Sequence, residues 1–182
     1  KKKEKSPIEF FDDWAKKGKD VGMERGHKNS VTFMINKIKG NKPEGNLGID
    51  MGCGNGWTVR KLKKELKYKQ IIGIDGSPSM IKKAKKQDLE KNYICENIKN
   101  HQPEKKYDFI HSMEVLYYLE KPHKFIRKIY NSWIKKEGLF ILGIDHYKEN
   151  KPSINWPEEC GVYMNTKSKE EWINIIKTGG FK

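Results

Sequence analysis

The segment LGIDMGCGNGW (47–57) carries the residues whose types and spacing best indicate ligand chemistry. An apolar run ends at Asp50, and glycines follow at positions 52, 54 and 56. Glycine tolerates a positive φ and lets a backbone approach a ligand closely. The spacing lacks the third glycine of the G-x-G-x-x-G dinucleotide fingerprint, and no Lys-Ser or Lys-Thr pair follows as in a phosphate loop. A pyrophosphate ligand is therefore disfavoured.

A second acidic residue, Asp75, ends the apolar run IIGID. It follows the glycines by about 20 residues, the separation at which an acidic side chain accepts hydrogen bonds from the hydroxyls of a ribose. A glycine turn without phosphate contacts and an acidic residue for a ribose together favour an adenosine-like ligand.

The chain around these residues alternates between apolar runs and amphipathic segments. Unbroken apolar runs predict strands covered on both faces, at 47–51, 70–75, 92–95, 107–112 and 138–144. Helical spacing and capping residues predict helices at 6–18, 27–40, 57–67, 78–87, 122–135 and 169–177. This alternation indicates an α/β fold with a doubly wound, mostly parallel sheet and helices on both faces. Its ligand binds at the carboxyl ends of the strands.

Four segments that occur in this order, LGIDMGCGNGW, IIGIDGSPSMIKKAKK, YDFIHSMEVLYYL and GLFILGIDHY, carry a family resemblance. They resemble the class I S-adenosylmethionine-dependent methyltransferases, most closely the ubiquinone/menaquinone-methylase-like (methyltransferase type 11) branch. The resemblance runs from about Leu47 to Tyr147. It implies a Rossmann-like core, S-adenosyl-L-methionine as cofactor and S-adenosyl-L-homocysteine as product.

The resemblance also implies roles for individual residues. Asp50 and the turn 52–54 hold the methionine end of the cofactor, and Asp75 holds the ribose. Asn97 stands where many relatives have an acidic residue that receives the adenine amino group, and its side-chain oxygen can accept the same hydrogen bond. The expected cofactor-binding residues are Asp50, Met51, Gly52, Cys53, Gly54, Asp75, Gly76, Ser77, Met80, Asn97, Ile98, Ser112 and Trp14.

Methyl transfer is an in-line displacement in which the enzyme mainly holds the acceptor near attack geometry. A general base is useful for a hydroxyl, an amine or an acidic carbon. Polar residues follow the two strands at 107–112 and 138–144, and the expected catalytic residues among them are His146, Tyr147 and Glu114. His146 is the preferred base, because an imidazole titrates near neutral pH. A structural hydrogen-bonding role for His146, or a reaction without a base, is the alternative.

The first 45 residues form an expected helical lid before the core at 46–182, and the whole chain is expected to be one domain. Phe10, Phe11 and Trp14 can form an aromatic wall beside the cofactor sulfonium, or can pack the helix onto the sheet. The segment 22–30 is expected to be a polar loop with Glu24, Arg25 and His27 available for contacts. In the long loop 146–165, Tyr147, Trp156 and Tyr163 are expected to shape an acceptor pocket.

Composition gives weaker indications. The net charge is +14, but only three of the 38 basic residues are arginines, and an A- and T-rich genome accounts for many lysines. The three cysteines form no C-x-x-C pair, and the five histidines are dispersed, so neither a disulfide framework nor a metal site is expected. No run of about 18 apolar residues could span a membrane, and no secretory signal follows the charged start, so a cytoplasmic protein is expected.

The chain begins at Lys1 and stops at TGGFK (178–182). Methyltransferases that it resembles usually continue from such a Gly-Phe into two more strands, so a core shortened at its C-terminus is expected. The favoured function is methyl transfer to an unidentified small molecule. The alternative is an RNA methyltransferase or a non-catalytic nucleic-acid-binding protein of the same fold, for which a basic face beside the cleft would speak.

Overall fold

The computed structural model describes residues 5–42 and 44–182. The charged residues 1–4, on which the expectation of no secretory signal partly rests, lie outside the described residues. The helices are α1 Pro7–Lys16, α2 Gly22–Asn41, α3 Trp57–Glu65, α4 Pro78–Gln87, α5 Pro122–Lys128, α6 Trp156–Cys160 and α7 Lys169–Thr178. The strands are β1 Glu44–Met51, β2 Lys67–Asp75, β3 Tyr93–Cys95, β4 Tyr107–Met113 and β5 Ile134–Gly143.

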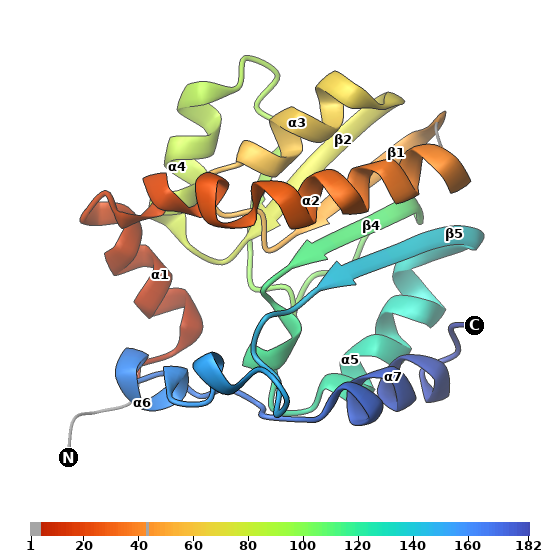
Figure 1. The fold of residues 1–182 in the computed structure, drawn as a ribbon. Coiled ribbons are helices and arrows are strands. Elements are labelled where there is room, and N and C mark those ends of the chain that lie inside the picture. The colour runs from red at the N-terminus through yellow and green to blue at the C-terminus, as the bar shows by residue number, and fades with distance from the viewer. Residues whose placement is uncertain (1–4, 43) are drawn as a thin grey trace.

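The five strands form a parallel sheet in the order β3-β2-β1-β4-β5 (Figure 1). Chain order reverses between β1 and β4, which is the switch point at which doubly wound sheets bind ligands. The register there places Asp50 beside His111 and beside Gly73. The expected Rossmann-like parallel sheet is confirmed.

Helices cover both faces of the sheet, as expected (Figure 1). α2, α3 and α4 pack on one face, where Ile35, Leu62 and Ile81 belong to one buried cluster. α5 and α7 pack on the other face, where Ile126 and Trp172 belong to a second cluster. Because each strand supplies side chains to a buried layer on either side, its sequence reads as a continuous apolar run.

Several element boundaries differ from the expectations, and β1 and β2 each begin three residues earlier than expected. α2 begins at Gly22 instead of residue 27, so the expected loop 22–30 is helical. α3 ends at Glu65 because Lys67 and Tyr68 already pair with β1. β5 begins at Ile134 instead of residue 138, because Ile134 is buried against Tyr107 before the register shifts. A turn of π-helix, Ile129–Trp133, occupies the end of the expected helix 122–135.

α1 lies across the carboxyl ends of the strands instead of on a face of the sheet (Figure 1). A capping box of Ser6 and Glu9 begins the helix, with Pro7 in its first turn. The Lys5 amide donates to Gly161 O (3.1 Å), which holds this start beside the end of α6. The helices of the expected lid therefore lie in two different places. α1 covers the ends of the strands, whereas α2 belongs to a helix layer on the sheet.

None of the helices in 5–42 and 44–182 has the length and apolar character needed to cross a membrane.

Candidate active site

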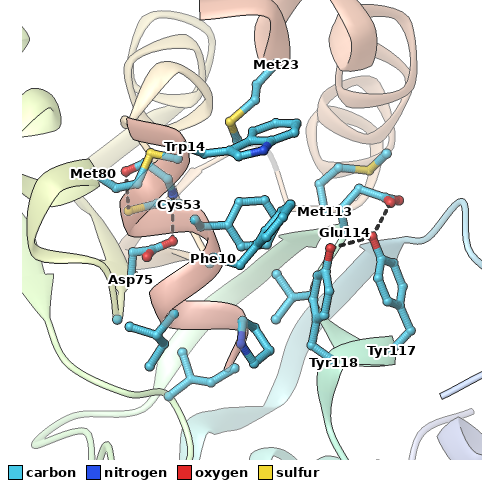
Figure 2. Close-up of a pocket in the computed structure, with 18 of the residues that line it drawn as sticks. Phe10, Trp14, Met23, Cys53, Asp75, Met80, Met113, Glu114, Tyr117 and Tyr118 are labelled. Atoms are coloured by element: carbon cyan, nitrogen blue, oxygen red, sulfur yellow. Dashed lines mark hydrogen bonds between the residues drawn. The ribbon is translucent and has the colours of Figure 1, made fainter. Parts of the chain in front are cut away.

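A cavity of about 470 Å³ lies at the carboxyl ends of the strands, under α1. Its walls come from α1, the start of α2, the glycine turn after β1, the ends of β2 and β4, and the segment 156–164. Figure 2 shows Asp75, Cys53 and Met80 at one end, Glu114, Tyr117 and Tyr118 at the other, and Phe10 between them. The cavity thus joins the glycine turn to the polar residues after β4.

Two glycines of the turn have conformations that other residues rarely adopt. Gly52 and Gly54 have φ values of 75° and 51°. A Cβ on Gly52 would lie 2.3 Å from Val115 Cγ2. The amides of Gly52 and Cys53 both donate to Ile74 O, at 2.8 and 3.0 Å, which fixes the turn against β2. The turn is therefore rigid and presents bare backbone to the cavity.

The third glycine of the motif has a different role. Gly56 also has a positive φ, 81°, and it precedes α3. A Cβ there would lie 2.7 Å from Tyr93 Oη and 2.9 Å from Ala84 Cβ, so the absent side chain permits packing of the helix layer. Gly56 does not line the cavity. Of the three glycines in the G-x-G-x-G spacing, Gly52 and Gly54 therefore line the cavity, whereas Gly56 permits close packing of the helices.

Asp75 joins the glycine turn to the start of α4. Its Oδ2 accepts from the Gly54 amide at 2.9 Å, and its Oδ1 accepts from the Ser77 amide at 2.8 Å. Burial raises the pKa of Asp75, and the two amide bonds oppose that rise. Carboxylate oxygens have about four lone-pair sites in all, so capacity remains for hydroxyl groups in the cavity.

Asp50 forms a hydrogen bond with a buried histidine of the neighbouring strand. His111 Nδ1 lies 2.7 Å from Asp50 Oδ1, and both side chains are buried. His111 is fully buried, and its Nε2 has no hydrogen-bond partner among the described residues. Since Asp50 also lines the cavity, His111 orients a carboxylate that takes part in the cavity wall.

Glu114 is the carboxylate at the opposite end of the cavity. Its Oε2 accepts from the Tyr117 hydroxyl at 2.6 Å, and Tyr117 in turn lies 3.4 Å from the Tyr118 hydroxyl. Burial raises the pKa of Glu114 to about 7, against the lowering effect of the Tyr117 bond. The residue has a φ of 61°, a strained conformation that recurs at functional sites. Its Oε1 is buried without a hydrogen-bond partner in the described chain.

The structure brings most of the expected site residues to this cavity. Those that line it are Trp14, Asp50, Gly52, Cys53, Gly54, Asp75, Gly76, Met80, Asn97, Ile98 and Glu114. Those that do not line it are Met51, Ser77, Ser112, His146 and Tyr147. Met51 and Ser112 are buried side by side in β1 and β4. Ser77 caps α4, where its hydroxyl accepts from the Met80 amide.

His146 lies in a structural environment. Its Nδ1 lies 2.9 Å from Ser153 O, its Nε2 lies 2.8 Å from Thr166 Oγ1, and the side chain is fully buried. Burial lowers its pKa. Tyr147 is half-buried with Lys169 Nζ 5.1 Å from its ring centroid. Because both ring nitrogens of His146 contact protein atoms, this geometry does not support the preference for His146 as base.

The aromatic residues of α1 both pack together and face the cavity. Phe10, Phe11 and Trp14 have mutual ring-centroid distances of 5.2 to 5.7 Å, and all three line the cavity. Phe11 also meets Tyr118 edge to face at 5.5 Å. Of the expected aromatic residues in 146–165, Trp156 lines the cavity, whereas Tyr163 is exposed.

Two aspartates, Asp12 and Asp20, hold α1 in place over the cavity. One is half-buried and the other is buried, and neither was singled out from the sequence. Asp12 Oδ1 accepts from the Ser77 hydroxyl and the Ser79 amide, both at 2.8 Å, at the start of α4. Asp20, just after α1, accepts from Asn55 Nδ2 at 2.9 Å and pairs with Lys83 at 2.5 Å. These contacts bind α1 and its linker to the glycine turn and to α4.

The start of α2 contributes differently from the expected loop. Met23 and His27 line the cavity, and Figure 2 shows the Met23 sulfur beside Trp14. Glu24 and Arg25 are exposed and do not line it. One helical turn separates Met23 from His27, so both side chains share a face, and only His27 of the three expected polar residues reaches the site.

His101 is a further buried histidine, and it does not line the cavity. Its Nδ1 lies 2.7 Å from Glu96 Oε2, and its Nε2 lies 3.3 Å from the Tyr107 hydroxyl. In the part of the chain that the structure describes, no three His, Cys, Asp or Glu side chains are grouped to hold a metal ion, and the three cysteines are free.

A parallel sheet with a cavity, a glycine turn and two acidic strand ends at its switch point defines a Rossmann-like α/β protein. The chain belongs to the methyltransferase domain family, whose pattern matches residues 49–142, over half of the sequence. This agrees with the resemblance to class I S-adenosylmethionine-dependent methyltransferases.

Named relatives share this domain but differ in their acceptors. The chain is 28% identical to a malonyl-[acyl-carrier protein] O-methyltransferase of Halalkalibacterium halodurans, over 80% of this chain and 59% of that protein. It is also 28% identical to a tRNA U34 carboxymethyltransferase of Histophilus somni, over 64% of this chain and 45% of that protein. The chain thus spans about half the length of these curated relatives.

A solved structure extends the likeness beyond the core. The Haloferax volcanii complex between the Trm112 methyltransferase activator and a methyltransferase of unassigned function matches with a TM-score of 0.86 and 28% identity. The match covers 93% of this chain and 75% of that chain. The likeness therefore includes most of the helices before β1 as well as the sheet.

Proposed function

We propose that this protein is an S-adenosylmethionine-dependent methyltransferase acting on a small-molecule acceptor. The observation that carries the proposal is the single cavity that joins the glycine turn, Asp50 and Asp75 to Glu114. One end has the groups that an adenosine ligand needs, and the other has a carboxylate able to take a proton. A methyl donor and its acceptor would meet between these ends.

The residues present fit the cofactor. The bare turn at Gly52 to Gly54, where a Cβ on Gly52 would clash with Val115, suits close approach of the methionine end. Asp50, oriented by His111, would receive the ammonium group of that end, and Asp75 would receive the ribose hydroxyls. Gly76, Met80, Asn97 and Ile98 would border the adenine, with Met51, Ser77 and Ser112 supporting the walls from behind. When bound, the cofactor supplies a methyl group activated by a sulfonium.

Glu114 is the base that this geometry supports best. A pKa of about 7 leaves a large share of the side chain as carboxylate at neutral pH, which is the condition for efficient proton acceptance. Tyr117 donates to Oε2. Oε1 is buried without such a donor among the described residues, so a small movement of the side chain would bring it to an acceptor in the cavity. Tyr147 and His146 keep structural roles in this proposal.

The cavity favours a small molecule over the alternative of a nucleic acid. Among its described lining residues, Lys99 is the one lysine or arginine, although the chain has 38 such residues. Recognition of a phosphate backbone depends on clustered basic side chains. The lysines instead lie mainly away from the cavity, in keeping with a compositional origin.

Calorimetric titration with S-adenosylmethionine tests the proposal, and the chain offers a matched pair of aspartates. Asp75→Asn should reduce affinity at least about tenfold, because it removes a charge-assisted acceptor at the ribose. Asp108, at the opposite ends of the strands, likewise accepts from two amides, those of Asn46 and Leu47, both at 3.0 Å. Asp108→Asn loses the charge that pairs with Lys135, so it should reduce stability, and it should leave the affinity unchanged. Absence of binding by the folded wild-type protein would contradict the proposal.

A further inference from the structure

The cavity has an acceptor end that is chemically distinct from its cofactor end. We define the acceptor end by Phe11, Glu114, Tyr117, Tyr118, Trp156 and Glu159, all of which line the cavity. Figure 2 shows Glu114, Tyr117 and Tyr118 together, opposite Asp75 and Met80. Lys99 adjoins Asn97 and Ile98 in the chain and so belongs to the cofactor end.

The charge of the acceptor end is the reverse of the charge of the chain. The net charge of the protein is +14, yet the acceptor end carries the carboxylates of Glu114 and Glu159 and no lysine or arginine. A carboxylate or phosphate near the methyl-accepting atom would meet like charge in a partly desolvated site, which is strongly unfavourable. A cationic group would meet opposite charge.

The other walls of the acceptor end are faces and edges of aromatic rings. Tyr117 and Tyr118 have ring centroids 4.4 Å apart, and Phe11 meets Tyr118 at 5.5 Å. Aromatic faces attract ammonium groups, more strongly when the site is desolvated. Glu114 Oε1 is buried without a hydrogen bond of regular geometry in the described chain, and the Asp145 amide nearby lowers the pKa of the carboxyl. The Glu114 carboxyl therefore retains capacity to accept from an N–H or O–H group.

We propose that the methyl acceptor is an amine carried on a small apolar or aromatic scaffold, held by the carboxylates and rings of the acceptor end. This inference rests on the proposed function. The carboxylates would hold the ammonium form by charge, and the rings would contact both the scaffold and the nitrogen. A phenol acceptor fits less well, because its reactive phenolate would be repelled by Glu159 and would not be attracted to the electron-rich ring faces.

The proposed step balances in charge and protons. The bound ammonium gives one proton to the Glu114 carboxylate and becomes a neutral amine. The nitrogen lone pair forms the bond to the methyl carbon as the carbon–sulfur bond breaks, and that electron pair stays on sulfur as a neutral thioether. Positive charge thus moves from sulfur to nitrogen, where the Glu159 carboxylate and the rings of the acceptor end stabilise it.

Three probes with one phenyl scaffold test the inference, namely 2-phenylethylamine, 4-ethylphenol and 3-phenylpropionate. Each is titrated by calorimetry into the protein saturated with S-adenosylhomocysteine. The amine should bind at least about tenfold more tightly than either other probe. Glu159→Gln should weaken amine binding about threefold and leave the phenol unchanged, since Glu159 is an exposed rim charge.

Glu158→Gln is the matched control, because Glu158 precedes Glu159 in α6 and does not line the cavity. It should leave all affinities unchanged. Equal binding of the three probes, tighter binding of the acid or the phenol, or no binding of the amine would overturn the amine assignment. Failure of S-adenosylhomocysteine to bind would instead refute the proposed function, so the two failures are distinguishable.

Discussion

The Tyr117 hydroxyl donates a 2.6 Å hydrogen bond to Glu114 Oε2, while Oε1 of the same carboxyl is buried without a partner in the described chain. One oxygen is thus fixed by the Tyr117 hydroxyl, whereas the other has no hydrogen bond of regular geometry. The strained φ of 61° at Glu114 directs the side chain into this arrangement at the end of β4.

Glu114 should titrate near neutral pH, and Tyr117 should control its midpoint. Burial raises its pKa to about 7, and the Tyr117 hydroxyl lowers it by binding the charged form. Tyr117→Phe removes that donor, so the midpoint should rise by about one pH unit. Carboxyl-resolved NMR titration measures both values without an acceptor. A wild-type midpoint near the ordinary 4.5 would contradict the assignment.

Glu114→Gln should stabilise the protein at pH 8 and leave it unchanged at pH 4. The folded-state pKa of Glu114 lies above the ordinary value of 4.5. The wild type is therefore unaffected below pH 4.5 and loses stability progressively as the pH rises to about 7. The gain of the variant at pH 8 should be on the order of 2 to 3 kcal/mol in the free energy of unfolding. Denaturant titrations at the two pH values supply both the measurement and its internal control.

Asp12→Asn should loosen the attachment of α1, the helix that covers the cavity, to α4. Asp12 accepts from Ser77 and Ser79, and the Lys16 ammonium beside it holds its pKa well below the ordinary range. Loss of this charge should weaken S-adenosylmethionine binding about fivefold. Asp13→Asn is the control, because Asp13 pairs with Lys5 and does not contact α4 in any described interaction. Equal affinities of the two variants would show that the attachment of α1 does not depend on Asp12.

His146→Gln should reduce stability and spare ligand binding. Both ring nitrogens contact protein atoms, Ser153 O and Thr166 Oγ1, in a buried site. Loss of these two contacts should lower the free energy of unfolding by about 1 to 3 kcal/mol. Denaturant unfolding and calorimetry with S-adenosylmethionine measure the two effects. A stable variant that binds the cofactor but transfers no methyl group would restore His146 as the base.

The sequence was sufficient for the features that local rules determine. Apolar runs locate the strands, and Ser6, Ser77 and Ser168 act as helix caps as predicted. Asp50 and Asp75 reach the cavity because the carboxyl ends of parallel strands meet at one edge of the sheet.

Other features depend on contacts between distant segments, which no local pattern reports. His146 contacts Thr166 across a loop, and Asp12 contacts Ser77 from a different element. Neither contact can be predicted from the residues adjacent in the sequence. The prediction of a loop at 22–30 was wrong, because the segment is helical. Tertiary packing of α2 outweighs the helix-breaking tendency of Gly22 and Gly26.

The position of α1 also has a kinetic consequence. The helix is fastened at one end to the segment after α6, through Lys5 and Gly161, and at the other to α4 and the glycine turn. The same helix covers both the cofactor end and the acceptor end of the cavity. In the proposed reaction, the spent donor and the methylated product would both leave past this helix, so a movement of α1 that opened the cavity would serve both steps.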